Sequence, residues 1–165
     1  MICIYIGMER IAIFPGSFDP FTRGHEAIVD EALRLFDRVI VAIGHNTQKR
    51  GLLTVEARKR LIEELYRTEE RVEVVVYNTL TGDEARRLGA KTIVRSVRNA
   101  TDFEYERTME RANRHIFPDL DTVILIAPAE VEHISSSLVR ELHAFGHDVA
   151  ELMPEGIRLE EYLDK

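Results

Sequence analysis

The chain alternates between short apolar runs and longer amphipathic stretches. The runs are rich in β-branched residues, which is typical of strands buried on both faces of a parallel sheet. A clear example reads RVIVAIG and is closed by a glycine. The predicted strands cover residues 10–14, 38–44, 72–76, 91–95 and 122–126.

Between these runs, hydrophobic residues recur with the spacing of a helix. The first stretch places Ile28 and Ala32 on one stripe, Thr54 can cap the second, and Gly89 and Gly146 can end two later ones. The predicted helices cover residues 25–36, 55–66, 82–88, 103–116, 135–145 and 154–163.

This alternation predicts an α/β fold: a single Rossmann-like, doubly wound domain with a five-stranded parallel sheet and right-handed crossovers. We assign the domain to residues 8–165 and expect residues 1–7 to be an N-terminal extension or an upstream start. In such folds, ligands collect outside the carboxyl ends of the strands. The residues that follow each strand are therefore the first candidates for function.

Composition and charge narrow the function classes. A chain of 165 residues, 45% hydrophobic and 31% charged, suits one globular domain. A net charge of −7 argues against a broad nucleic-acid surface, so any anion site must be local. The single cysteine, Cys3, is interpreted as an inert small hydrophobe and fits a reducing cytoplasm. No signal peptide or membrane span is predicted, because no run approaches about 20 apolar residues.

The turn after the first strand combines several groups that suit a phosphate. Gly16 lets the backbone approach a ligand closely, the following N–H groups can face phosphate oxygens, and Ser17 adds a hydroxyl. Gly24 allows a close approach at the helix start, and His25 lies in the first turn, where the helix dipole favours an anion. Either part alone is consistent with a tight connection or a surface histidine. The combination GSFDPxTxGH is far more specific, and it is neither a Walker A loop nor a dinucleotide fingerprint.

This motif resembles the signature of the nucleotidyltransferase superfamily, (T/H)xGH after a G(S/T)FDP turn, with Thr22 in the first position. The resemblance implies that His25 is the catalytic residue. It would bind the triphosphate and stabilise in-line displacement at the α-phosphorus. Ser17 and Phe18 would contact the nucleotide and its phosphates.

Basic residues follow two further strands. Lys49 is a flexible point charge that suits an acceptor phosphate, whereas Arg50 is interpreted as solvated. Arg95 and Arg98 stand three residues apart just past a buried strand, where packing explains them poorly. They suit a bidentate grip on phosphate oxygens. Glu104 is interpreted as an acid favoured by the dipole at a helix start.

Three serines open the helix after the last strand. One serine there would be a routine N-cap, but Ser135, Ser136 and Ser137 together offer hydroxyls and N–H groups to a phosphate. The pattern ISSSxxR, which ends at Arg140, resembles a second superfamily signature.

Taken together, TxGH, Lys49, RSVRNATDFEYE and ISSSLVRE resemble the phosphopantetheine adenylyltransferase family. The resemblance assigns Ser17, Lys49, Thr81 and Arg95 to phosphopantetheine. It assigns to ATP the residues Ser17, Phe18, His25, Ser96, Val97, Arg98, Glu106, Val131, Glu132, His133, Ile134, Ser135, Ser136 and Ser137. Three positions depart from the family: Ser96 replaces glycine, Thr81 replaces leucine or methionine, and Val131 stands near a usual aromatic residue.

The resemblance implies AMP transfer from ATP to 4′-phosphopantetheine in coenzyme A biosynthesis, with dephospho-CoA and pyrophosphate as products. It also implies Mg²⁺ on the triphosphate, a homohexamer and feedback inhibition by coenzyme A. No metal-ligand cluster is visible in the sequence. The expected site is a ring of positive groups, His25, Lys49, Arg95 and Arg98, together with helix N-termini. The alternatives are a nicotinate-mononucleotide adenylyltransferase, a cytidylyltransferase, or a non-catalytic nucleotide-binding module.

Overall fold

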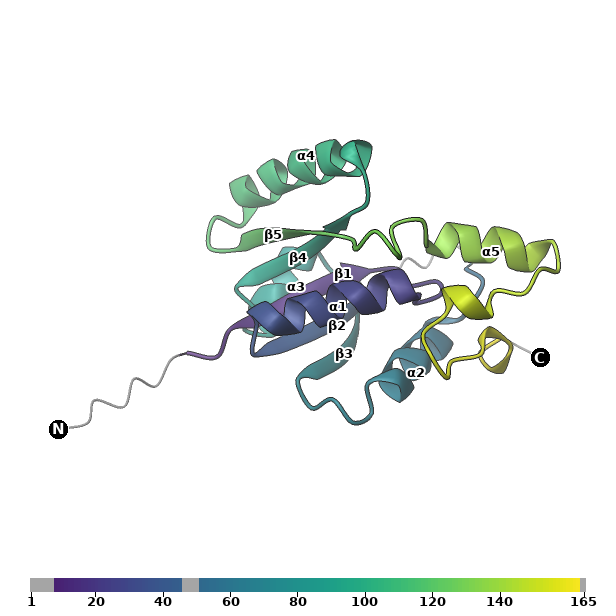
Figure 1. Cartoon of the computed structure of the whole chain (residues 1–165). Coiled ribbons are helices and arrows are strands. Elements are labelled where there is room, and N and C mark those ends of the chain that lie inside the picture. Colours follow the sequence, from purple (N-terminus) through teal and green to yellow (C-terminus); the bar gives the residue numbers. More distant parts are fainter. Residues whose placement is uncertain (1–7, 46–50, 164–165) are drawn as a thin grey trace.

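The computed structural model describes residues 8–45 and 51–163. Its centre is one sheet of five parallel strands in the order β3-β2-β1-β4-β5. The predicted α/β fold is thus confirmed (Figure 1). The strands are β1 (Ile11–Gly16), β2 (Arg38–Gly44), β3 (Val72–Tyr77), β4 (Thr92–Val97) and β5 (Asp121–Ile126).

Five helices cover the two faces of this sheet. Helices α1 and α2 pack on one face, where they share a hydrophobic core with the C-terminal segment, and α3 and α4 lie on the other. Their bounds are α1 (Arg23–Leu35), α2 (Val55–Leu65), α3 (Thr81–Arg87), α4 (Ala100–Ile116) and α5 (Ser136–Ala144). The chain steps from β1 to β2 to β3 in one direction and then returns to β4 and β5, so the strand order reverses between β1 and β4.

Helix ends follow the expected caps at most positions. Thr54 accepts a hydrogen bond from Ala57 N–H at 3.2 Å, and Gly89 and Gly146 adopt φ of 74° and 75° just past α3 and α5. Helix α4 begins at Ala100, three residues earlier than predicted, because Asn99 caps it by accepting from the N–H of Asp102.

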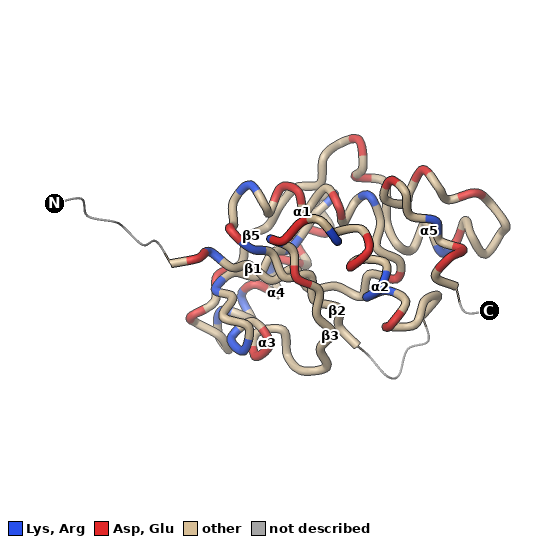
Figure 2. Tube along the Cα trace, turned by 90° about the horizontal axis from the view of Figure 1, so that it is seen from below, with Lys and Arg blue, Asp and Glu red and all other residues tan. Residues whose placement is uncertain are grey.

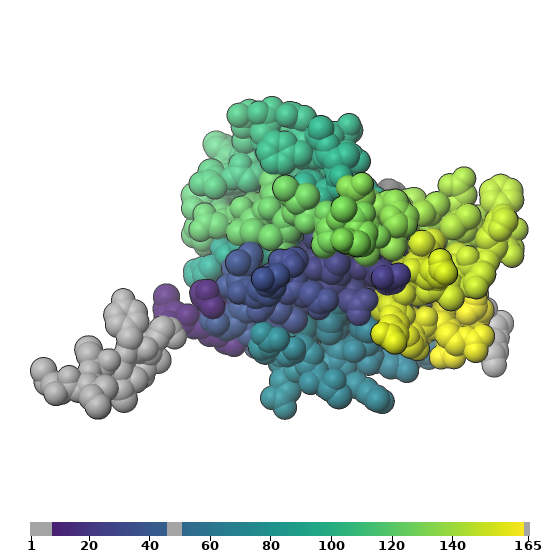
Figure 3. All heavy atoms as spheres, viewed as in Figure 1, coloured from purple at the N-terminus to yellow at the C-terminus, as the bar shows by residue number. Residues whose placement is uncertain are grey.

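The predicted C-terminal helix over residues 154–163 is wrong. The structure has only two short 3₁₀ turns here, Ala150–Leu152 and Leu159–Glu161. Gly156 adopts φ of 79°, which a right-handed helix cannot accommodate, and Pro154 precedes it. Buried residues such as Met153 and Tyr162 anchor the segment against α1 and α2 without helical spacing. Figure 3 shows this segment lying against the N-terminal end of α1, where Arg23 donates to the Glu151 carbonyl at 3.0 Å.

Charged side chains are distributed over many elements of the described chain. Figure 2 shows lysine and arginine interspersed with aspartate and glutamate along the trace. None of the described helices is long and apolar enough to cross a membrane. An anion site on this molecule therefore depends on local geometry, as the net charge predicts.

Candidate functional site

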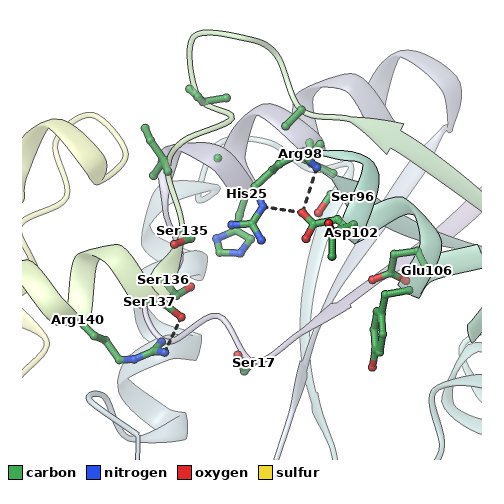
Figure 4. Close-up of a pocket in the computed structure, with 17 residues that line it drawn as sticks. Ser17, His25, Ser96, Arg98, Asp102, Glu106, Ser135, Ser136, Ser137 and Arg140 are labelled. Atoms are coloured by element: carbon green, nitrogen blue, oxygen red, sulfur yellow. Dashed lines mark hydrogen bonds and ion pairs between the residues drawn. The ribbon is translucent and has the colours of Figure 1, made fainter.

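A cleft of about 730 Å³ opens at the carboxyl ends of β1, β4 and β5 (Figure 4). It lies where the strand order reverses, the usual ligand position in open α/β sheets. The structure brings most of the predicted ATP residues together here. Those that line the cleft are Ser17, His25, Ser96, Arg98, Glu106, Val131, Ile134, Ser135, Ser136 and Ser137.

The other predicted residues lie elsewhere. Outside the lining, but next to residues that belong to it, are Phe18, Arg95, Val97, Glu132 and His133. Thr81 begins α3 beyond the end of β3, where its hydroxyl is 2.8 Å from the Tyr77 hydroxyl. Lys49 and the expected N-terminal extension, residues 1–7, fall outside the described residues.

His25 is held in one orientation by the start of α1. The helix begins at Arg23 with Thr22 as its N-cap, so His25 occupies the third helical position and its Nδ1 accepts from the Thr22 N–H at 3.0 Å. The Thr22 hydroxyl is also 3.0 Å from Nδ1. Because a backbone N–H can only donate, the neutral ring carries its proton on Nε2. The available Nε2–H is thus a hydrogen-bond donor at the cleft.

Aromatic packing completes the setting of His25. Its ring centroid is 5.1 Å from that of Phe18, edge-on, and 5.3 Å from that of Phe21. Burial first, and then the positive charge of Arg98, lower the pKa of His25 from 6.5 to about 4. The ligand-free ring is therefore neutral near pH 7. It contributes an oriented donor, not the positive charge that we expected from the sequence.

Gly16 has a structural role besides the ligand approach that we predict from the sequence. A β-carbon at this position would lie 2.7 Å from Cζ of the Phe18 ring, so glycine makes room for that ring and not only for a ligand. Phe18 itself adopts φ of 47°, a left-handed conformation that costs energy for a bulky residue. Phe18 as a whole is only 2% exposed. Only the backbone of Phe18 can contact a nucleotide, whereas its side chain supports His25.

The N-terminus of α5 has its serine hydroxyls already engaged. Ser135 Oγ caps the helix by accepting from the Leu138 N–H at 3.1 Å, and Ser136 Oγ donates to the Pro20 carbonyl at 2.9 Å. Ser137 Oγ accepts from Arg140 at 3.0 Å. Because Ser135 caps the Leu138 N–H, the N–H groups of Ser136 and Ser137 at the start of the helix are what α5 offers to an anion.

Across the cleft, two arginines are paired with carboxylates of α4. Arg95 binds Glu106 through Nε and Nη2, both at 2.7 Å, and its Nη1 is 3.4 Å from the Pro15 carbonyl. Arg98 Nε donates to Asp102 at 3.0 Å. Figure 4 shows the Arg98 and Asp102 pair beside His25, with Glu106 farther along α4.

Among the cleft residues that the sequence-based site list omitted, two are charged, Asp102 and Arg140. Asp102 orients Arg98, and Arg140 donates to the Asp19 carbonyl at 2.6 Å as well as to Ser137. Arg140 was visible as the end of the ISSSxxR pattern, but its partner lies 121 residues away in the chain. Asp102 stood in the quoted DFEYE segment, where spacing alone does not distinguish it from a helix-start acid.

Comparison with known proteins agrees with this geometry. A family model described as cytidylyltransferase-like matches residues 13–142. A phosphopantetheine adenylyltransferase from Porphyromonas gingivalis is 48% identical over 152 residues, which cover 92% of this chain and 99% of that protein. Another from Cytophaga hutchinsonii is 46% identical over 147 residues, covering 89% and 98% of the two chains.

Among solved structures, a bifunctional NMN adenylyltransferase/ADP ribose pyrophosphatase from Francisella tularensis superposes with a TM-score of 0.68 at 20% identity. The match covers 88% of this chain and 45% of that longer chain, and it shows the fold alone. The bifunctional enzyme in complex with AMP and a manganese ion gives a TM-score of 0.66 at 20% identity, covering 91% and 46% of the chains. The two relatives at 48% and 46% identity match over almost their whole length, so they show the family as well as the fold. This chain belongs to the phosphopantetheine adenylyltransferase family, within the cytidylyltransferase-like group.

Proposed function

We propose that this protein transfers AMP from ATP to 4′-phosphopantetheine and releases dephospho-CoA and pyrophosphate. The observation that carries the proposal is the placement of the His25 donor, the N-terminus of α5 and Arg98 around one cleft, with Arg95 beside it at the end of β4. Relatives that are 48% and 46% identical carry the name of this activity.

The reaction itself needs little covalent help from the protein. The acceptor phosphate has a second pKa of about 6, so near pH 7 it is already an anionic nucleophile. One of its oxygens attacks the α-phosphorus of ATP in line with the bond to the bridging oxygen of pyrophosphate. That bond breaks and pyrophosphate leaves with the electron pair. The barrier comes from bringing two anions together, so oriented donors and positive charge are what the site must supply.

Each cleft group then has a role. The Nε2–H of His25 donates to the phosphoryl oxygens on which charge builds up, and the first N–H groups of α5 bind the triphosphate. Arg98 adds positive charge on the opposite wall. Arg95 can turn Nη1 to the acceptor phosphate, because Glu106 holds its Nε and Nη2 and the contact of Nη1 with the Pro15 carbonyl is long, at 3.4 Å. Lys49 stays a prediction for the same phosphate.

ATP is expected to enter as its magnesium complex. Among the described residues, no group of three or more His, Cys, Asp and Glu side chains could hold a metal ion. Mg²⁺ also favours phosphate and water oxygens over a protein cage. The ion therefore belongs to the substrate, and its charge would offset part of the repulsion between the two phosphates.

Assembly and regulation extend the proposal. Helix α4 presents apolar side chains to solvent, with Phe103, Met109 and Ile116 at 44%, 40% and 57% exposure. Such a surface suits contact between subunits, and we place an interface of the homohexamer here. Coenzyme A contains the product dephospho-CoA, so it can occupy the same cleft as a feedback inhibitor. A cytoplasmic location is consistent with the single cysteine.

A pyrophosphate-release assay separates this function from its rivals. We expect release with ATP and 4′-phosphopantetheine, none with ATP and nicotinate mononucleotide, and none when CTP replaces ATP. The His25→Ala variant, purified in the same way, is the control for activity that comes from contaminating enzymes. Release with nicotinate mononucleotide alone would identify the rival adenylyltransferase, and binding of ATP without release from any acceptor would identify a non-catalytic module.

A further inference from the structure

A buried ion pair lies under the turn between β1 and α1. Arg58 of α2 and Asp19 are only 8% and 6% exposed, and Arg58 Nε is 3.4 Å from Asp19 Oδ1. Neither side chain lines the cleft. Burying two charges carries a desolvation cost that their attraction often fails to offset, so stability alone is a weak reason for the pair.

Both partners also bind the backbone on either side of them. Arg58 donates from Nε and Nη2 to the Leu53 carbonyl at 2.9 and 2.7 Å, and from Nη1 to the Ser17 carbonyl at 3.2 Å. Asp19 accepts from the N–H groups of Leu52 and Leu53, each at 2.8 Å. These bonds join the turn after β1 to the segment that leads into α2.

The space around the pair is filled. A β-carbon on Gly51 would collide with the guanidinium of Arg58 and the carboxylate of Asp19. Gly51 thus lies directly against the pair, and the planar guanidinium spans the Leu53 and Ser17 carbonyls. A lysine could place a single point of charge there but could not reproduce the fork.

The bond to Ser17 decides the direction of the next N–H. The peptide between Ser17 and Phe18 is trans, and in a trans peptide the C=O and the N–H point in opposite directions. With the Ser17 carbonyl held toward Arg58, the Phe18 N–H points away from α2, on the side where Ser17 lines the cleft. Within residues 8–45 and 51–163, this N–H donates to no protein acceptor.

The same peptide precedes the strained residue of the turn. Phe18 has φ of 47°, and such a conformation persists only where its surroundings over-determine it. Arg58 holds the carbonyl before Phe18, and Arg140 holds the carbonyl of Asp19 after it, at 2.6 Å. The strain is thus maintained from both sides of the residue.

We propose that Arg58 is a positioning residue of the transfer reaction: by holding the Ser17 carbonyl, it aims the Phe18 N–H at the phosphates of ATP. Asp19 holds the guanidinium in place through the ion pair. The proposal rests on the function proposed above, and it adds a residue that never touches the substrate.

The test compares variants of Arg58 with matched variants of Arg60. Arg60 lies two residues farther along α2, donates to the Glu161 carbonyl at 2.9 Å and is remote from the cleft. For Arg58→Lys we expect kcat/KM for ATP to fall roughly 10–100-fold, the loss typical of a misplaced reacting group. The KM for 4′-phosphopantetheine should change far less. Arg60→Lys should match the wild type.

Chemical rescue adds a measurement that a loss of folding would not reproduce. Low concentrations of guanidinium should restore part of the turnover of Arg58→Ala and leave Arg60→Ala unchanged, because only the first variant has a guanidinium-shaped space. Circular dichroism and thermal unfolding of each variant report whether the chain folds. If Arg58→Ala does not fold, Arg58→Lys and Arg58→Gln carry the kinetic comparison.

The outcomes separate the two proposals. No AMP transfer by the wild type would reject the proposed function, and ATP affinity from calorimetry would then still compare Arg58→Lys with Arg60→Lys. The positioning role is overturned if the wild type is active and the Arg58 variants lose no more kcat/KM than the Arg60 variants. It is also overturned if every substitution at 58 unfolds the chain, since Arg58 would then act only through stability.

Discussion

The two walls of the cleft present phosphate-binding groups in different ways. On the wall formed by the β1–α1 turn and α5, most ligand-facing groups are neutral donors whose directions are fixed by other hydrogen bonds, such as that between Thr22 N–H and His25 Nδ1. The arginine of this wall, Arg140, is bound to the Asp19 carbonyl and to Ser137. On the β4–α4 wall, Arg98 lines the cleft and Arg95 lies beside it, and each of these cations already binds a carboxylate.

This difference indicates that the two walls contribute to different steps, one to the chemical step and the other to substrate binding. A neutral donor with a fixed direction needs no rearrangement when charge develops on a phosphoryl oxygen, which is the condition for lowering a barrier. A cation paired with a carboxylate must share or release that partner when a phosphate binds, so its contribution appears mainly in affinity. Variants on the first wall should therefore change kcat, and variants on the second should change KM.

The largest effect is expected for His25→Ala. Loss of one oriented donor to a developing oxyanion lowers kcat by roughly 10²–10³-fold, with the fold intact. His147→Ala, in the exposed turn after α5, is the control and should behave as the wild type. Steady-state pyrophosphate release gives kcat and KM for each variant. Near-normal turnover of His25→Ala would show that His25 takes no part in the reaction. The proposed difference between the two walls would then be wrong.

Next in size is the effect of Arg95→Ala on acceptor binding. Removing a charged hydrogen-bonding group should raise the KM for 4′-phosphopantetheine roughly 10–100-fold, with a smaller change in kcat. Glu106→Gln keeps the shape of the partner but removes its charge, so the rise should be no more than about tenfold. Arg34→Ala, an exposed pair on α1, controls for the loss of a surface arginine. An unchanged KM in Arg95→Ala would show that another group binds the acceptor phosphate.

The sequence predicts several residues of the cleft but not the partners that orient them. The TxGH motif and the strand-end rule located His25 and the serines of α5, because those signals are local. The partners that orient them are remote: Arg58 is 41 residues from Ser17 and Arg140 is 121 residues from Asp19. The periodicity of hydrophobic residues does not predict contacts between residues so far apart in the chain. The neutral state of His25 likewise depends on burial among Phe18 and Phe21, which only the folded chain creates.

Where prediction from sequence failed, the competing cause is identifiable. The segment over residues 154–163 carries apolar residues that suit a helix, but Gly156 adopts a positive φ and the apolar side chains pack individually into the core. For Gly16, ligand approach stays a prediction, and the sequence did not show that this glycine also accommodates a ring of the protein itself. Both cases depend on what the backbone meets in three dimensions.

A smaller effect distinguishes Gly16 from a glycine that serves only the fold. In Gly16→Ala the new methyl group must displace the Phe18 ring, costing about 1–3 kcal/mol of stability and disturbing the support of His25. Gly89→Ala meets open space but at φ of 74°, so it costs about 1–2 kcal/mol through the backbone alone. Denaturant unfolding should show similar losses in both variants, and only Gly16→Ala should lose turnover, roughly 10–100-fold. Equal turnover of the two folded variants would mean that Phe18 does not support His25.

The smallest effect is a dependence of stability on pH. His25 has a pKa of about 4 in the folded chain and 6.5 as the ordinary value, so between these two pH values the unfolded chain binds a proton that the folded chain does not. The free energy of unfolding should therefore decrease as the pH falls from 6.5 to 4, and this group should cause no further loss below that window. Urea unfolding of the wild type and His25→Ala at several pH values measures the difference in slope, with His147→Ala as the control. Because a bound triphosphate favours the charged imidazolium, ATP should raise the pKa of His25 in an NMR titration. A ligand-free pKa near 6.5 would show that the ring is solvated in the empty cleft and not buried against Phe18 and Phe21.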